Sequence, residues 1–136
     1  MEISLKSVVA FLVVIALVYI PTLIFRWHLD YSWIDALLHF LGGAWAAFLF
    51  FFLFHNMFVP EIAGHQWEKI RILILAVSFA ALLGVFWEFH EFILSQYFFW
   101  YLQQSITDTM GDFLMDILGA LCLSLWLLFT RKSLSR

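Results

Sequence analysis

The sequence predicts an all-α integral membrane protein, a bundle of four transmembrane helices that forms one domain over residues 1–136. Two observations predict this fold. Hydrophobic residues make up 65% of the chain and charged residues only 12%, whereas soluble domains average about half apolar and about a quarter charged residues. In addition, four segments come close to the roughly 20 mostly apolar residues that a helix needs to cross a bilayer.

The four predicted helices occupy residues 8–25, 34–54, 70–97 and 108–129. The first could be mistaken for a signal peptide, because Lys6 precedes an apolar stretch. No small-residue cleavage pattern follows, so we expect a retained helix that kinks or ends near Pro21. The polar stretch from His55 to Glu68 is predicted to be a loop.

The distribution of basic residues predicts the orientation of the bundle. Cytoplasmic loops of membrane proteins carry the excess of Lys and Arg. One side of the predicted bundle has only Arg26, and the other side has Lys6, Lys69, Arg71, Arg131, Lys132 and Arg136. We therefore expect both termini to be cytoplasmic in a multi-pass protein of the plasma (inner) membrane. The net charge of -3 argues against a nucleic-acid partner.

Six carboxylates lie within or at the ends of the apolar segments. They are Asp35, Glu88, Glu91, Asp108, Asp112 and Asp116. A charge at membrane depth costs about 2.5 to 3.5 kcal/mol on insertion scales. Such a cost, repeated six times, requires that these groups be paired, protonated or bound to a cation.

Helical spacing groups these acids on three helix faces. The sets are Asp35 with His39, Glu88 with Glu91, and Asp108 with Asp112 and Asp116, each spaced by three or four residues. The topology brings all three faces to the extracytoplasmic half of the bundle. Gly84, Gly111 and Gly119 are predicted to allow close helix packing. His90 points away from the acidic face of its helix, and we expect His28 and Asp30 to be solvated.

The cluster has no Lys or Arg at its depth, so a bound cation or shared protons must balance it. Glu88, Glu91, Asp112, Asp116 and His39 are the predicted metal ligands. Oxygen-rich ligation with one imidazole suits Mg, Mn, Zn or Ca, and carboxylate-bridged iron is also open. The alternative for these groups is a purely structural hydrogen-bonding role. Asp35 and Asp108 lie at helix starts, where an acid also stabilises the helix.

The stretch DTMGDFLMDILGA at residues 108–120 resembles the last-helix signature of YjdF-like small inner-membrane proteins. It is also similar to the VanZ-like family, in which an Asp is followed four residues later by a polar residue and then by Gly-Ala. The segments DALLHF at 35–40 and WEFHEF at 87–92 fit as well. Asp116 stands where VanZ-like chains typically have Asn, which favours the YjdF-like branch. The resemblance implies a membrane bundle with an outward-facing polar site and no known reaction.

The leading functional hypothesis is a metal-dependent membrane hydrolase or transferase that acts on a lipid or lipid-linked substrate. The candidate catalytic groups are His39, Asp35 and Asp108, with His39 as a ligand or general base and the two acids beside the metal or the substrate. The metal would activate water or polarise an oxygen. The alternatives are a small cation or proton transporter and a non-catalytic membrane scaffold. The sequence is also compatible with a homo-oligomer.

Overall fold

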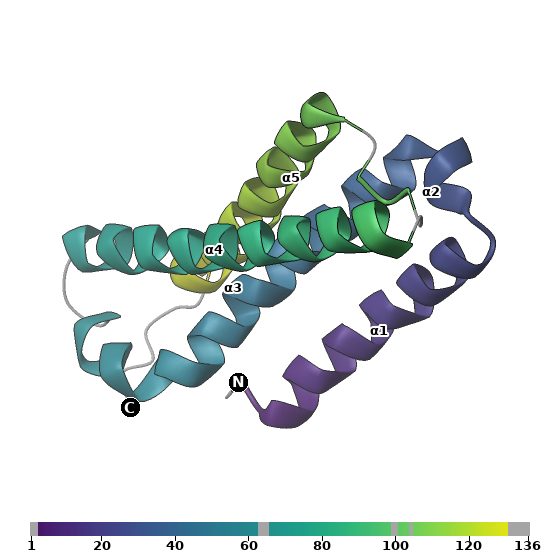
Figure 1. The fold of residues 1–136 in the computed structure, drawn as a ribbon. Helices are drawn as coiled ribbons and strands as arrows, with labels where there is room; N and C mark the ends of the chain where they lie inside the picture. The colour runs from purple at the N-terminus through teal and green to yellow at the C-terminus, as the bar shows by residue number, and fades with distance from the viewer. Residues whose placement is uncertain (1–2, 63–65, 99–100, 104, 131–136) are drawn as a thin grey trace.

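The computed structural model describes residues 3–62, 66–98, 101–103 and 105–130. All of its longer elements are helices (Figure 1). The elements are α1 (Leu5–Ile24), α2 (Trp27–Asp30), α3 (Ser32–Ile62), α4 (Gln66–Phe98), α5 (Ile106–Leu125) and the π-helical turn η1 (Trp126–Thr130). Four of the helices are long and apolar enough to cross a membrane. The predicted fold class, an all-α protein with four transmembrane helices, is confirmed.

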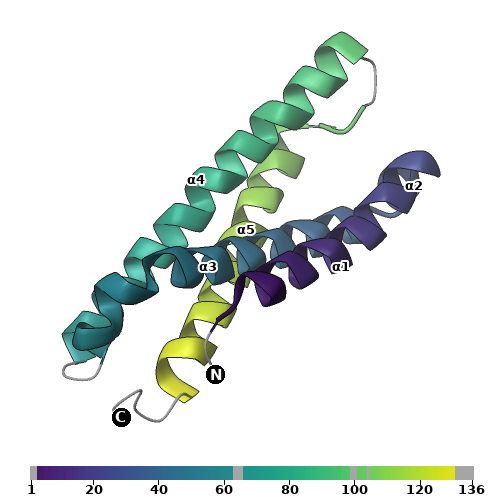
Figure 2. The ribbon, with the colours of Figure 1, turned by 90° about the horizontal axis from the view of Figure 1, so that it is seen from below.

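Helices α3, α4 and α5 pack against one another and form the centre of the bundle, while α1 packs along α3. Figure 2 shows α1 beside α3, with the start of α1 and the end of η1 at the same end of the bundle as the α3–α4 connection. The opposite end carries α2 and the connection from α4 to α5. We call this opposite end the outer end, because the distribution of Lys and Arg predicts that it faces away from the cytoplasm.

One helix boundary agrees with the prediction and another differs from it. Helix α1 continues through Pro21 and ends at Ile24, within one residue of the predicted end, and the Thr22 hydroxyl donates a hydrogen bond of 2.9 Å to the carbonyl oxygen of Val18. The loop predicted from His55 to Glu68 is wrong over most of its length, because α3 runs to Ile62 and α4 begins at Gln66. The prediction rested on the polarity of this stretch and on its Pro60 and Gly64. Polar side chains do not by themselves end a helix, and α3 includes Pro60. Residues 63–65 lie outside the described part of the chain.

The buried faces of α3, α4 and α5 change character along the bundle axis. At the inner end they carry large apolar side chains, namely Phe50, Phe51, Ile72, Leu127 and Leu128 together with Ala76. The middle layer consists of the alanines Ala46, Ala47, Ala80 and Ala120. At the outer end the same faces become polar, with His39, Glu88, Glu91, Asp112 and Asp116. The packed core thus passes from large apolar side chains through alanines to a polar layer.

Glycines allow α3 and α5 to cross at short range. A Cβ atom on Gly119 would overlap the backbone carbonyl of Phe40, and one on Gly43 would overlap the backbone of Asp116. These close contacts confirm Gly119 as a packing position, and they fix the register of α5 against α3. The same prediction is wrong for Gly111, whose added Cβ would meet nothing within 4 Å, because this residue faces away from the other helices and is exposed.

Replacing Gly119 with alanine is expected to destabilise the bundle by about 1–3 kcal/mol, because the added methyl group overpacks a contact made by rigid backbone. The matched control is Gly111→Ala, which adds the same methyl group in open space on the same helix and raises helix propensity. Thermal unfolding of both variants in the same detergent checks the prediction. Equal melting temperatures for the two variants would contradict it.

Candidate metal centre

Three helices deliver buried polar side chains to one place near the outer end. His39 comes from α3, Glu88 and Glu91 from α4, and Asp112 and Asp116 from α5, and each is only 3–5% exposed. The predicted convergence of three helix faces is therefore present in the fold. The sequence between Arg71 and Arg131 contains no Lys or Arg, and Arg26 is exposed.

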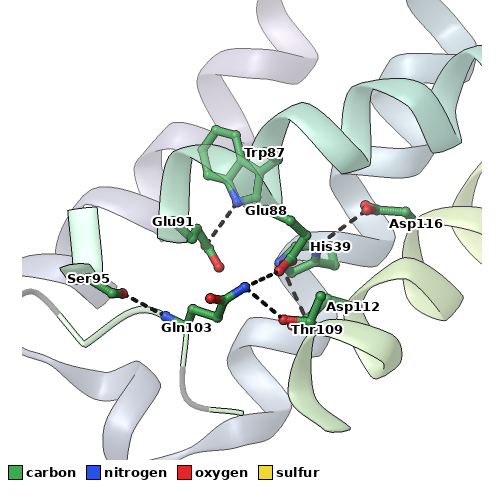
Figure 3. A network of polar contacts seen from close by, with 9 residues as sticks. All are labelled: His39, Trp87, Glu88, Glu91, Ser95, Gln103, Thr109, Asp112 and Asp116. Carbon is green, nitrogen blue, oxygen red and sulfur yellow. Dashed lines mark hydrogen bonds and ion pairs between the residues drawn. The ribbon is translucent and has the colours of Figure 1, made fainter. Parts of the chain in front are cut away.

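The His39 imidazole lies at the centre of the cluster, with its two nitrogens facing different carboxylates (Figure 3). Nδ1 lies 3.4 Å from Oδ2 of Asp116. Nε2 lies 3.7 Å from Oε1 of Glu88 and 3.9 Å from Oδ1 of Asp112. The first distance is within hydrogen-bonding range, and the other two are too long for a direct hydrogen bond. The ring is thus held on one side by Asp116 and left open on the other.

Asp116 occupies a space that exists because two neighbouring residues are glycines. A Cβ atom on Gly84 of α4 would overlap this carboxylate, and one on Gly43 of α3 would overlap the Asp116 backbone. Any larger residue at either position would displace Asp116. The close packing of three helices therefore sets the position of the Asp116 carboxylate, and through it the orientation of the His39 ring.

Glu88 is held through one of its two oxygens. The Gln103 side-chain amide lies 3.5 Å from Oε2 of Glu88 and donates a 3.0 Å hydrogen bond to the Thr109 hydroxyl. The backbone N–H of Gln103 in turn donates to the Ser95 hydroxyl at 2.9 Å, as Figure 3 shows. The other oxygen, Oε1, and the facing Nε2 of His39 are both buried without a hydrogen-bond partner. A buried polar atom left unpaired costs about 1–3 kcal/mol, so a ligand bound between these two atoms would stabilise the fold.

Three overlapping groups of side chains each bring their ligand atoms within 4.8 Å of one another. They are His39 with Glu88 and Asp112, Asp35 with His39 and Glu91, and Asp35 with Asp108 and Asp112. Only the first group is fully buried and contains the unpaired atoms. The Glu91 carboxylate in the second group accepts a 2.9 Å hydrogen bond from the Trp87 indole. Asp35 and Asp108 are half-buried in the first turns of α3 and α5.

The other predicted residues have different surroundings. Asp116 does not join any of the three groups among the described residues, and its carboxylate faces Nδ1 of His39 instead. Asp108 lies in the first turn of α5, as predicted, and the N-cap is Ser105, whose side chain accepts a hydrogen bond from the Asp108 backbone. His28, predicted to be solvated, is buried at 4% exposure, with Nδ1 3.4 Å from the Thr22 carbonyl oxygen. His90 and Asp30 are exposed, as predicted.

The sequence did not single out the uncharged members of the network. Trp87, Gln103 and Thr109 hydrogen-bond to the cluster, and Tyr19 lines a cavity beside it. Helical spacing could have identified two of them. Trp87 lies four residues before Glu91 and Thr109 three residues before Asp112, so each shares a helix face with an acid. Gln103 lies in the α4–α5 connection and has no such periodic signal.

Comparison with known proteins places the chain in a family of membrane proteins. No curated protein and no solved structure matches it. A family model described as predicted membrane protein (DUF2238) matches residues 2–133, almost the whole chain. That description agrees with the four candidate membrane spans, and it names no activity. The protein therefore belongs to the DUF2238 family of predicted membrane proteins.

Proposed function

We propose that His39, Glu88 and Asp112 bind a divalent metal ion, and that this centre hydrolyses or transfers a group of a membrane lipid or lipid-linked substrate. One observation carries the proposal. Nε2 of His39 and Oε1 of Glu88 are buried, face each other across 3.7 Å and lack a hydrogen-bond partner. A shared metal ion satisfies both atoms and also offsets the repulsion between the surrounding carboxylates.

The spacing of the ligand atoms supports a shared ion. Two ligands that each lie about 2.1 Å from a tetrahedral zinc ion are about 3.4 Å apart. The separations of 3.7 Å and 3.9 Å from Nε2 of His39 are slightly wider, and they suit an ion with ligand distances of about 2.1–2.4 Å. One imidazole with two carboxylates favours Zn or Mn over Mg or Ca, which prefer ligation by oxygen alone.

The neighbouring residues support this centre in distinct ways. Asp116 holds the His39 ring through Nδ1, so that Nε2 points at the metal position, an arrangement common among metal-binding histidines. Because both ring nitrogens are then in use, His39 serves as a ligand rather than as a general base. A bound divalent ion would supply an activated water molecule or polarise a substrate oxygen. Asp35 and Glu91, whose ligand atoms lie within 4.8 Å of one of the His39 nitrogens, would accept the proton of that water. Asp108 lies beside Asp35 and Asp112 and would face the substrate.

The resemblance to YjdF-like and VanZ-like proteins supports the same placement of the site. The residues that carry the resemblance include Asp35, His39, Glu88, Asp112 and Asp116, all of which belong to the cluster or contact it. We propose a relation to the YjdF-like branch on this basis. The resemblance assigns no reaction, so the chemistry proposed here depends on the geometry alone.

The packing of the bundle supports the transporter hypothesis less well than it supports a metal-dependent enzyme. Below the polar layer, the described part of the bundle is filled first by alanines and then by large apolar side chains. The buried faces of these two layers contain no ionisable residue that could relay a cation or proton inward. A metal ion bound in the polar layer would therefore be retained and not passed through the single chain.

A lipid-turnover assay tests the proposed activity. The protein is reconstituted into vesicles made from a bacterial total lipid extract with Zn²⁺ or Mn²⁺, and the lipids are followed by mass spectrometry. We expect the wild-type protein to convert at least one lipid class and Asp112→Asn to be inactive, with Asp30→Asn as the control at an exposed carboxylate. Release of trapped metal ion from the vesicles without any lipid conversion would favour the transporter instead.

A further inference from the structure

A cavity of about 200 Å³ lies beside the metal centre, between α1, α3 and α4. Its polar end is formed by Asp35, His39, Glu91 and Asp116, and its walls are otherwise almost entirely apolar. Along α3 the lining extends from Asp35 to Ala46, a distance of about 16 Å at 1.5 Å per helical residue. The cavity is thus elongated along the bundle axis. Of the three proposed metal ligands, His39 alone is part of its lining, at the polar end.

Small side chains create this space, and the cavity reaches the lateral surface of the bundle. Ala16, Gly42 and Ala80 line it where larger residues would fill it. Leu12 of α1 and Trp87 of α4 also line it and are 43% and 39% exposed. Because these residues belong to membrane spans, the medium that meets the opening is the bilayer and not water. Only an apolar molecule would enter such a cavity from the side.

The polar end contains a further unsatisfied group. The Tyr19 hydroxyl is buried, lacks a hydrogen-bond partner and belongs to a residue of the cavity lining. The Tyr19 ring packs edge-on against Trp87 with the ring centroids 5.3 Å apart, and this contact joins α1 to α4. A tyrosine hydroxyl can donate a hydrogen bond to an ester or phosphate oxygen. The cavity therefore offers an apolar channel whose polar end contains this donor and His39, one of the proposed metal ligands.

We infer that this cavity binds one alkyl chain of a membrane glycerophospholipid, whose polar linkage lies at Tyr19 and the metal centre. The inference rests on the function proposed above, since it identifies the lipid of that reaction. An elongated apolar cavity suits a linear chain, and a lipid is the molecule present at the highest concentration at this depth. The α1 helix is then the side wall of a lipid-binding site, and it is not only a membrane anchor.

Photo-crosslinking tests the occupant. The probe is a phosphatidylglycerol with a diazirine on one acyl chain, mixed into vesicles of unlabelled phosphatidylglycerol and phosphatidylethanolamine, and adducts are mapped by mass spectrometry. We expect adducts on Ile15 and Leu38 of the cavity wall in the wild-type protein. We expect these adducts to be lost in Ala16→Phe, which fills the cavity from α1, and to be retained in Ala10→Phe, the same change at an exposed position of α1.

Gly42→Leu fills the cavity from the opposite wall, where an added Cβ meets only Oδ1 of Asp116 at 3.9 Å, so the result does not depend on one variant folding. Adducts confined to outward-facing residues such as Val13 would overturn the inference. Cavity adducts that persist in both filled variants, or that are lost equally in Ala10→Phe, would also overturn it.

The metal content of the same samples separates the lipid-site inference from the proposed metal-dependent function. Cavity adducts in a protein that binds no metal count against the proposed function alone, and bound metal without cavity adducts counts against the lipid site alone.

Discussion

Replacing His39 with alanine is expected to lower the affinity for a divalent ion by more than about 100-fold, since loss of even an outer partner of a metal ligand typically costs about 10–100-fold. The imidazole is the only nitrogen ligand in the described cluster, and its Nε2 faces both Glu88 and Asp112. Without the imidazole, Glu88 and Asp112 lack the third ligand of the proposed site. Titration of the purified metal-free protein with Zn²⁺ or Mn²⁺ measures the effect.

The matched control for this experiment is His90→Ala. His90 lies on α4 close to the cluster in sequence, but it is exposed, and its ring packs against Trp87 with centroids 5.1 Å apart. We expect the affinity of this variant to stay close to that of the wild-type protein. Equal affinities of His39→Ala and wild type, or equal losses in the two histidine variants, would show that the His39 imidazole does not ligate the ion.

Removing the Asp116 carboxylate is expected to lower the metal affinity by about 10–100-fold in Asp116→Ala. The carboxylate lies 3.4 Å from Nδ1 of His39 and outside the groups that could bind the ion directly. Its removal frees the ring to rotate, but it removes no ligand. Asp116→Asn keeps an oxygen that can accept the hydrogen bond from Nδ1, so we expect this variant to retain more affinity than Asp116→Ala.

The comparison of these variants distinguishes a positioning role from direct ligation. If Asp116 orients His39, the order of affinity is wild type, Asp116→Asn, Asp116→Ala and then His39→Ala. A loss in Asp116→Asn as large as that in His39→Ala would instead make Asp116 a direct ligand, as the sequence alone suggested. Gly84→Ala gives an independent check, because its added methyl group would displace the Asp116 carboxylate and should reproduce part of the loss.

The fold was predictable from sequence because the membrane imposes it. Backbone groups in lipid must be satisfied within the helix, so long apolar segments have few other structures available. The boundaries were less predictable. The polarity of His55 and the residues after it indicated a loop, whereas α3 continues to Ile62, because helix formation depends on backbone and side-chain geometry more than on polarity.

The members of the site were predictable from sequence, but their pairing was not. Carboxylates spaced every third or fourth residue share one face of a helix, whatever that helix packs against. This spacing, together with the topology, predicted that Glu88, Asp112 and the other acids lie close together. Which nitrogen of His39 faces which acid depends on the crossing of α3 and α5 at Gly43 and Gly119, and one sequence does not reveal how two helices cross. Sequence reasoning therefore treated Asp116 and Asp112 alike, although the fold gives them different partners.

The uncharged residues and the cavity were missed for a related reason. A tyrosine such as Tyr19 is ordinary near a membrane interface, and nothing in its own sequence neighbourhood shows that its hydroxyl lies buried beside acids of other helices. The burial of His28 was missed in the same way. It was expected in a solvated loop, but it belongs to the short helix α2 and is buried against the end of α1.

The metal content of the purified protein tests the central claim most directly. The protein is purified in detergent without chelator, and each metal is quantified per chain by elemental analysis. We predict about one Zn or Mn ion per chain in the wild-type protein and in Asp30→Asn, and none in Glu88→Gln combined with Asp112→Asn, because the paired change removes two of the three proposed ligands. Wild-type protein that holds no stoichiometric divalent metal in any preparation, and takes up none when Zn²⁺ or Mn²⁺ is added, would contradict the account.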